Sequence, residues 1–310
     1  MKLSDIGERG LIERLSRKIA IGDDAACVRF GNSYLVISTD MLYGKTDILP
    51  EMNFEQIGKL AVTVNLSDIA AMGAKPIAFL LSYGSPDMEV DDFGGIIKGV
   101  EKQCKKFDVT YAGGDTNETD ELILSGTALG LAKRPVMRSG AKVGDIICVT
   151  GELGTAALGV EISTKKLRIN EGKILKKALE PEPRVCEGLV LGKYASSMMD
   201  ISDSFAVSLH EIAKQSRVGA EINLENLPIT ENARKIAEKL HLDMRDFALY
   251  GGGDYELLFT IPKRYLSKIK RNVEFNDIGQ IVKTGVVGLK NGKTLKIEQR
   301  GYEHFKKDKQ

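Results

Sequence analysis

The chain has few of the residues that most often carry nucleophilic or zinc-based chemistry. Its 310 residues include four cysteines and three histidines. The cysteines lie far apart and form no C-x-x-C pair, so we expect small core residues rather than a zinc site or a disulfide framework. No histidine lies beside a serine or cysteine nucleophile, which leaves triad chemistry without support. The seven residues are Cys27, Cys104, Cys148, Cys186, His210, His241 and His304.

The sequence also lacks a charge excess and long apolar runs. Lys and Arg total 44 against 43 for Asp and Glu, so the net charge of +1 gives no reason to expect nucleic acid or an anionic membrane as a partner. No apolar run approaches the ~20 residues of a membrane span, and the first ten residues contain no apolar signal segment. We therefore expect a globular cytoplasmic protein.

The common nucleotide-binding motifs are missing as well. The chain contains no G-x-x-x-x-G-K-[ST] loop, no protein-kinase catalytic loop and no Rossmann fingerprint. The nearest match, GLKNGKT from Gly288 to Thr294, is one residue short and is typical of a hairpin turn. If ATP binds, we expect a site rich in carboxylates and metal ions, without a phosphate-loop lysine.

The most informative segment, residues 53–76, predicts one buried helix. Asn53 and Gln56 form a start signal of the capping-box kind, and a glycine and a proline mark the end. The positions between them are apolar nearly all round, which is typical of a buried helix. Asp68 then needs a partner from elsewhere, because no Lys or Arg follows Lys59 in the helix. Asp68 is either a solvated surface residue or a metal ligand. The other acidic motifs of the chain distinguish between these two interpretations.

The pattern of strands and helices predicts a mixed α/β (α+β) subunit of two domains, since 310 residues exceed one ordinary core. Residues 133–145 are basic, contain glycine and have no period, so we place the boundary there, with domains 1–136 and 137–310. The predicted strands are 25–30, 34–39, 77–82, 109–112, 122–132, 146–150, 197–201 and 255–261, and the predicted helices are 7–17, 53–72, 91–107, 154–165, 172–180, 184–195 and 204–218. A charged tail closes the chain.

Aspartates recur in turns and at the predicted strand ends. Ligand sites in open α/β sheets lie at the carboxyl ends of strands, so this repetition predicts convergence, although each aspartate alone is more often a turn former. Converging carboxylates repel one another unless cations neutralise them. Oxygen-only ligands favour Mg²⁺, Mn²⁺ or Ca²⁺ over zinc, and short aspartates suit Mg²⁺ shared with phosphates. The aspartates are Asp23, Asp24, Asp40, Asp68, Asp115, Asp200 and Asp203.

Taken in order, these motifs resemble the thiamine-monophosphate kinase family, whose superfamily includes aminoimidazole ribonucleotide synthetase, selenophosphate synthetase and a hydrogenase-maturation protein. The similarity runs from about residue 5 to residue 305. The matching motifs are G-D-D-A-A, S-T-D, N-L-S-D-I-A-A-M-G-A-x-P, G-G-D-T, R-S-G-A-x-x-G-D, M-D-I-S-D, G-D-Y-E-L-L-F-T and G-Y-E-H-F.

The resemblance implies a homodimer in which the N-terminal sheets of two subunits pair into a barrel, with ATP and several Mg²⁺ ions held between the domains. The implied reaction transfers a phosphoryl group from ATP to thiamine monophosphate and needs no catalytic side chain, only alignment and charge neutralisation. The implied metal ligands are Asp24, Ser38, Thr39, Asp40, Asp68, Asp115, Asp200 and Asp203. The implied ATP contacts are Gly114, Asp115, Arg138 and Ser202, and the implied acceptor contacts are Asp47, Gly253 and Gln299.

The chain departs from the family pattern at three positions. Ser204 follows D-I-S-D where the family has glycine, Gly253 replaces the glutamate of G-G-E-D-Y-E, and Gln299 stands where some members have an aromatic residue. The last two concern the acceptor rather than the metals. Gly253 either loosens acceptor binding or serves a turn that needs a positive φ.

Two alternatives stay open. One is another ATP-dependent enzyme of the superfamily with a different acceptor. The reactive cysteine of selenophosphate synthetases has no counterpart before Cys27, and the chain ends in KKDKQ rather than in the cysteine of the hydrogenase-maturation relative. The other is a nucleotide-binding relative without turnover, although every aspartate of the motifs is present.

Overall fold

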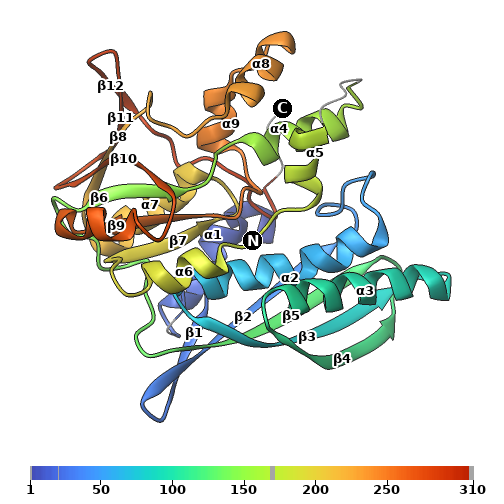
Figure 1. Ribbon diagram of the computed structural model, residues 1–310. Helices are drawn as coiled ribbons and strands as arrows, with labels where there is room; N and C mark the ends of the chain where they lie inside the picture. The colour runs from blue at the N-terminus through green and yellow to red at the C-terminus, as the bar shows by residue number, and fades with distance from the viewer. Residues whose placement is uncertain (1, 20, 168–171, 307–310) are drawn as a thin grey trace.

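The computed structural model describes residues 2–19, 21–167 and 172–306, which fold into two sheets joined around a central helix (Figure 1). The last four residues of the predicted charged tail, 307–310, lie outside the described residues. The fold is a mixed α/β arrangement of two domains, as predicted. The predicted boundary at residues 136–137 falls in the segment that connects the two sheets and stays a prediction.

The N-terminal domain is a five-stranded mixed sheet with two helices on one face (Figure 1). Its strand order is β1-β2-β5-β3-β4, in which β3 and β4 are parallel and the other pairs antiparallel. The elements are α1 (Leu3–Ser16), β1 (Ala26–Phe30), β2 (Ser33–Tyr43), α2 (Phe54–Ala71), β3 (Lys75–Ser85), α3 (Val90–Lys106), β4 (Thr110–Glu118) and β5 (Ile123–Ala132).

The C-terminal domain contains a seven-stranded sheet in the order β12-β11-β8-β10-β6-β9-β7. Its first elements are β6 (Ile146–Thr150), α4 (Thr155–Thr164), α5 (Gly172–Leu179), α6 (Val185–Leu191), β7 (Ser197–Ile201), α7 (Phe205–Ser216) and β8 (Gly219–Asn223). The remaining elements are α8 (Glu231–Lys239), α9 (Met244–Tyr250), β9 (Glu256–Ile261), η1 (Lys263–Tyr265), α10 (Leu266–Ile269), β10 (Phe275–Val282), β11 (Val286–Lys290) and β12 (Lys293–Lys296).

Helix α2 is the central element of the fold, and its sequence explains its position. Asn53 caps it as predicted: its side chain accepts from the backbone nitrogen of Gln56 at 2.9 Å, and the Gln56 side chain accepts from the Asn53 nitrogen at 2.9 Å. Because the helix is apolar nearly all round, it is buried on both sides. One side packs on β2, β3 and β5, and the other contacts α6 and β7 of the C-terminal domain.

The opposite face of the N-terminal sheet carries apolar side chains that no helix covers among the described residues (Figure 1). Residues paired directly across antiparallel strands share a face, and the pairs Leu35–Leu131 and Ile37–Leu129 lie on this one. Met41, on the same face, is 60% exposed. Both sheets are open in the described chain, and the barrel predicted between two subunits stays a prediction.

Three local predictions need correction. The helix predicted from residue 7 begins at Leu3 and kinks at Gly7, where φ is +67°. The strand predicted to end at Thr39 continues to Tyr43, so the S-T-D motif lies inside β2. The G-G-D-T motif likewise lies inside β4 rather than after it, because β4 continues to pair with β3.

The cysteines and the hairpin near the C-terminus can also be placed. Cys104 and Cys148 are buried and Cys27 is half-buried, as expected of core residues, but Cys186 is exposed, which corrects that prediction. Strands β11 and β12 form the hairpin predicted around GLKNGKT. None of the helices in the described part of the chain has the length and apolar character to cross a membrane.

Candidate functional site

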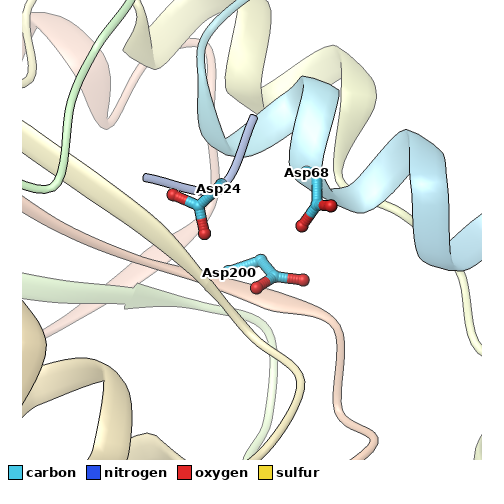
Figure 2. A group of neighbouring side chains, drawn as sticks. All are labelled: Asp24, Asp68 and Asp200. Carbon is cyan, nitrogen blue, oxygen red and sulfur yellow. The ribbon is translucent and has the colours of Figure 1, made fainter. Parts of the chain in front are cut away.

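Three carboxylates from distant parts of the chain meet where the two domains face each other. Asp24 precedes β1, Asp68 lies near the end of α2, and Asp200 lies in β7. One oxygen of each lies within 4.8 Å of the others, and Figure 2 shows the three carboxylates grouped together. The sequence predicted all three as metal ligands, and the fold brings them together.

Asp68 is fixed by a strand of the same domain. The Ser38 hydroxyl on β2 donates to Asp68 Oδ2 at 2.6 Å. Burial raises the pKa of Asp68 well above its usual range, and the charges of Asp40, Asp200 and Asp24 raise it further. Asp68 is half-buried and held by Ser38 within the cluster, which argues against the alternative of a solvated surface face.

Asp200 is fixed by α2 and thereby connects the two domains. The Ser67 hydroxyl donates to Asp200 Oδ2 at 2.7 Å, and the Ser202 hydroxyl donates to Oδ1 at 3.3 Å. Burial, followed by the charge of Asp24, raises the pKa of Asp200 to about 7. The site thus depends on contacts from both domains.

Asp24 and Arg138 form an ion pair with unused hydrogen-bonding atoms. Arg138 Nη2 donates to Asp24 Oδ1 at 3.0 Å, and the Asp24 side chain is fully buried. Burial opposes the positive charge of Arg138, but Asp24 outweighs it and raises the arginine pKa above its ordinary value. Within the described residues, Asp24 Oδ2 and Arg138 Nε are buried without hydrogen-bond partners. Such orphaned atoms are uncommon in folded proteins and point to a ligand.

Further carboxylates surround this cluster. Asp40 lies beside Ser38 and its backbone nitrogen donates to Asn65 Oδ1 at 3.0 Å; burial raises its pKa. Burial, followed by the charge of Glu8, raises the pKa of Asp203 to about 6. Burial, followed by the charge of Asp24, also raises the pKa of Asp23 to about 6. The site therefore holds an excess of negative charge.

Two predicted metal ligands lie on the opposite face of the N-terminal sheet. Thr39 alternates with Ser38 along β2, and its hydroxyl donates to the Gly126 carbonyl at 2.9 Å. Asp115 is exposed on β4 opposite Ser82, beside the predicted ATP contact Gly114. The structure does not bring these residues to the three-carboxylate cluster, and their roles stay predictions.

The three residues predicted to contact the acceptor lie in three different segments of the chain. Asp47 Oδ2 accepts from the backbone nitrogen of Tyr43 at 2.8 Å and stabilises the turn after β2. Gln299 is exposed and its side chain donates to Glu211 at 3.0 Å. Gly253 has φ of +85°, and its nitrogen donates to the Ser202 carbonyl at 2.7 Å. The positive φ that the turn interpretation requires is present, and any side chain there strains the backbone, while the role of Gly253 at the acceptor stays a prediction.

Residues outside the predicted set also build the site. Ser67 and Asn65 connect α2 to Asp200 and to β2, and their only sequence signal is the position beside Asp68 in the motif N-L-S-D. Ser204, in place of the family's glycine, caps α7 by accepting from the Val207 nitrogen at 3.1 Å and donates to the Arg300 carbonyl at 2.8 Å. This departure therefore affects a helix cap and not the carboxylates.

The arrangement resembles known domains over most of the chain. Models of the AIR synthase related protein family match twice, the N-terminal domain over residues 22–132 and the C-terminal domain over residues 142–290. The hydrogenase maturation protein HypE in complex with ATP shares the fold, with a TM-score of 0.75 at 19% identity.

Relatives with higher sequence identity show to which family within these proteins the chain belongs. The thiamine-monophosphate kinase of Pyrococcus horikoshii is 41% identical over 93% of this chain and 91% of its own length. That of Aquifex aeolicus is 32% identical over 98% of this chain and 100% of its own. The structure of AaThiL complexed with AMPPCP and TMP has a TM-score of 0.91 at 31% identity, covering 98% of this chain and 99% of that one. The chain belongs to the thiamine-monophosphate kinase family, within the AIR synthase related proteins.

Proposed function

We propose that this protein transfers the terminal phosphoryl group of ATP to the phosphate of thiamine monophosphate, giving thiamine diphosphate. The observation that supports this most strongly is the convergence of Asp24, Asp68 and Asp200 between the domains, in a chain that matches thiamine-monophosphate kinases along almost its whole length. The relative AaThiL binds AMPPCP and TMP together, and this chain covers 99% of it.

The site fits Mg²⁺ on its own chemistry. Three carboxylates converge, and Asp24 Oδ2 has no hydrogen-bond partner among the described residues. The atoms that could bind a metal ion there are all oxygens, which suits Mg²⁺. Asp24, Asp68 and Asp200 would hold metal, with Ser38, Asp40 and Asp203 completing the surroundings. Bound Mg²⁺ would neutralise charge on the phosphates during transfer.

The side chains then act by binding and alignment. Arg138 Nε, buried and without a partner in the described part of the chain, is a suitable donor to an ATP phosphate. We also assign ATP contacts to Gly114, Asp115 and Ser202, and further metal contacts to Thr39 and Asp115. The acceptor phosphate is already ionised at neutral pH, so no general base is required.

The acceptor side differs from the family pattern. We propose that Asp47, Gly253 and Gln299 line the thiamine-binding side of the site. Because Gly253 provides no carboxylate for the thiamine ring, we expect the phosphate and the metals to contribute more to acceptor binding than in relatives with glutamate.

We further propose the division of labour between domains and the assembly of the protein. Residues 1–136 form the ATP- and metal-binding and dimerisation domain, and residues 137–310 the second domain. The uncovered apolar face of the N-terminal sheet supports a homodimer in which two sheets pair into a barrel. Since the reaction consumes ATP, we propose a cytoplasmic location.

A coupled assay with ATP, Mg²⁺ and a panel of acceptors tests the function. We expect thiamine diphosphate from thiamine monophosphate and none from unphosphorylated thiamine. Transfer to a different acceptor would instead support another enzyme of the superfamily. Binding of ATP without transfer to any acceptor would support a relative that has lost turnover.

A further inference from the structure

Tyr255 has a backbone conformation that a bulky residue rarely adopts. Its φ is +50°, in the left-handed region, and it follows the three glycines 251–253. Side chains with a Cβ are strained there, so such residues persist only where surrounding contacts enforce them, and they occur preferentially at functional sites. Tyr255 has no role in the proposed function described so far.

The contacts on either side of Tyr255 enforce this conformation. Asp254 is buried and accepts from the backbone nitrogens of Gly154 at 2.8 Å and Ala156 at 3.3 Å. Glu256 is buried and accepts from Arg184 Nε at 2.6 Å and Lys177 Nζ at 3.0 Å. Two firmly bound neighbours leave the backbone of Tyr255 little freedom.

Tyr255 lies next to the carboxylate cluster. Its nitrogen donates to the Ile201 carbonyl at 2.9 Å, one residue beyond Asp200. Although it belongs to the C-terminal domain, its ring packs against the hydrophobic core of the N-terminal domain. Tyr255 therefore lies between the two domains, beside the strand that carries Asp200.

The phenol hydroxyl has acidic neighbours and no bonded partner. Within residues 2–19, 21–167 and 172–306 this hydroxyl forms no hydrogen bond, and the Tyr255 side chain is half-buried. Burial raises the pKa of Tyr255, and the charges of Asp200, Asp40, Asp47 and Asp68 raise it further. The phenol therefore stays protonated at neutral pH, and the aspartates whose charges act on it include members of the cluster and Asp47, which we assign to the acceptor side.

We propose that the Tyr255 hydroxyl donates a hydrogen bond to a phosphate oxygen of the acceptor and positions that phosphate against the carboxylate cluster. This inference rests on the proposed function. Carboxylates only accept hydrogen bonds, so a site built from aspartates needs neutral donors to orient a phosphate without competing with metals. The strained backbone is explained if it serves to deliver this donor.

Tyr255→Phe tests the proposal because it removes the hydroxyl and keeps the ring packed on the N-terminal core. We expect kcat/KM for thiamine monophosphate to fall about tenfold or more, the effect of one hydrogen bond to a charged group, while KM for ATP and the melting temperature stay unchanged. Tyr111→Phe is the matched control, since Tyr111 packs on the same core from β4. Unchanged acceptor kinetics, or an equal loss for both substrates, would overturn the proposal.

Binding measurements separate this inference from the proposed function. In calorimetry with Mg²⁺ and a non-hydrolysable ATP analogue, Tyr255→Phe is expected to weaken thiamine monophosphate about tenfold and to leave unphosphorylated thiamine unaffected. If the wild-type enzyme binds thiamine monophosphate but transfers nothing to it, the proposed function fails. The difference in affinity loss between thiamine monophosphate and thiamine then still decides the role of Tyr255. An equal loss of affinity for both ligands, or no loss, would refute the proposed hydrogen bond from Tyr255. A wild-type protein that binds no thiamine monophosphate would refute it as well.

Discussion

Asp24, Asp68 and Asp200 lie closer together than three like charges would stay without compensation. Among the described residues, Arg138 Nη2 bonds one of them at 3.0 Å, while serine hydroxyls bond the other two. Neutral donors orient carboxylates without cancelling their charge. Arg138 pairs with only one of the three carboxylates, so the arrangement supports the metal ion proposed above.

Replacing Asp68 by asparagine tests this arrangement. Asp68→Asn keeps the size of the side chain and removes one charge, so we expect kcat to fall at least about a hundredfold, or about 3 kcal/mol of transition-state stabilisation. Steady-state kinetics at saturating Mg²⁺ measure the effect. Asp108→Asn is the control, because Asp108 is exposed and pairs with Lys75. Near-normal activity of Asp68→Asn would remove Asp68 from the metal site.

Among individual residues, the sequence predicted the members of the cluster, because Asp24, Asp68, Asp200 and Arg138 belong to distinctive motifs. It did not predict the side of the sheet on which the other residues lie. Side chains alternate along a strand, so the position of Thr39 depends on β2 continuing to Tyr43 in register with β5. That register depends on contacts with distant residues, which a local pattern does not contain.

Helix α2 keeps Asp68 in place through an unusually close contact with α3. A Cβ at Gly58 would overlap the backbone of Ile96, and a Cβ at Gly99 would overlap the backbone of Glu55. Glycines at both positions therefore let the two helix backbones touch. The functional carboxylate depends on a helix crossing that tolerates no side chain at these points.

Gly99→Ala is expected to destabilise the protein by about 2–3 kcal/mol, because the added methyl group forces the helices apart. Gly94→Ala, in the same helix, is the matched control: its Cβ meets open space, so we expect a gain of about 0.5–1 kcal/mol from helix propensity alone. Denaturant titration measures both. Similar effects of the two substitutions would contradict the close-contact argument.

Several elements with a clear local signal were predicted, but the amphipathic helix α8, capped by Thr230, was missed, as were elements that depend on packing. The capping pair Asn53 and Gln56 gave the start of α2, and the strands 146–150 and 197–201 match β6 and β7 at both ends. Strand β8, with the sequence GAEIN, was missed because it is short and lacks clear alternation. It forms by pairing with β10 and β11, far along the chain.

The whole molecule holds its acidic site between two domains, so its stability is expected to depend on pH and Mg²⁺. Burial raises the pKa of Asp200 to about 7, and those of Asp23 and Asp203 to about 6. Since these values exceed the ~4 of an unfolded chain, the metal-free folded protein binds more protons between about pH 4 and pH 7. Its free energy of unfolding must therefore fall as the pH rises through this range.

We expect the metal-free protein to lose about 2–4 kcal/mol of stability between pH 5 and pH 8, and Mg²⁺ to restore most of the loss at pH 8. Denaturant unfolding in EDTA and in Mg²⁺ measures both quantities. Asp200→Asn is the matched variant, because it removes one of the three raised pKa values and should therefore reduce the pH dependence and weaken the response to Mg²⁺. A metal-free protein that is more stable at pH 8 than at pH 5 would contradict the assignment.

The uncovered face of the N-terminal sheet makes the assembly of the protein testable. Leu35, Ile37, Leu129 and Leu131 surround the middle of this face, and Met41 on it is 60% exposed. Contiguous apolar surface of this kind is usually covered by a partner, and a second copy can bury it symmetrically.

Light scattering at micromolar concentration should therefore give twice the chain mass of 33.9 kDa. Met41→Glu places a charge on the apolar face and should shift the protein to monomers, because an unpaired charge is costly in a buried interface. Val160→Glu is the control, since Val160 is 37% exposed on α4 and away from this sheet. A wild-type monomer, or an equal response to both substitutions, would show that this face is not the interface between subunits.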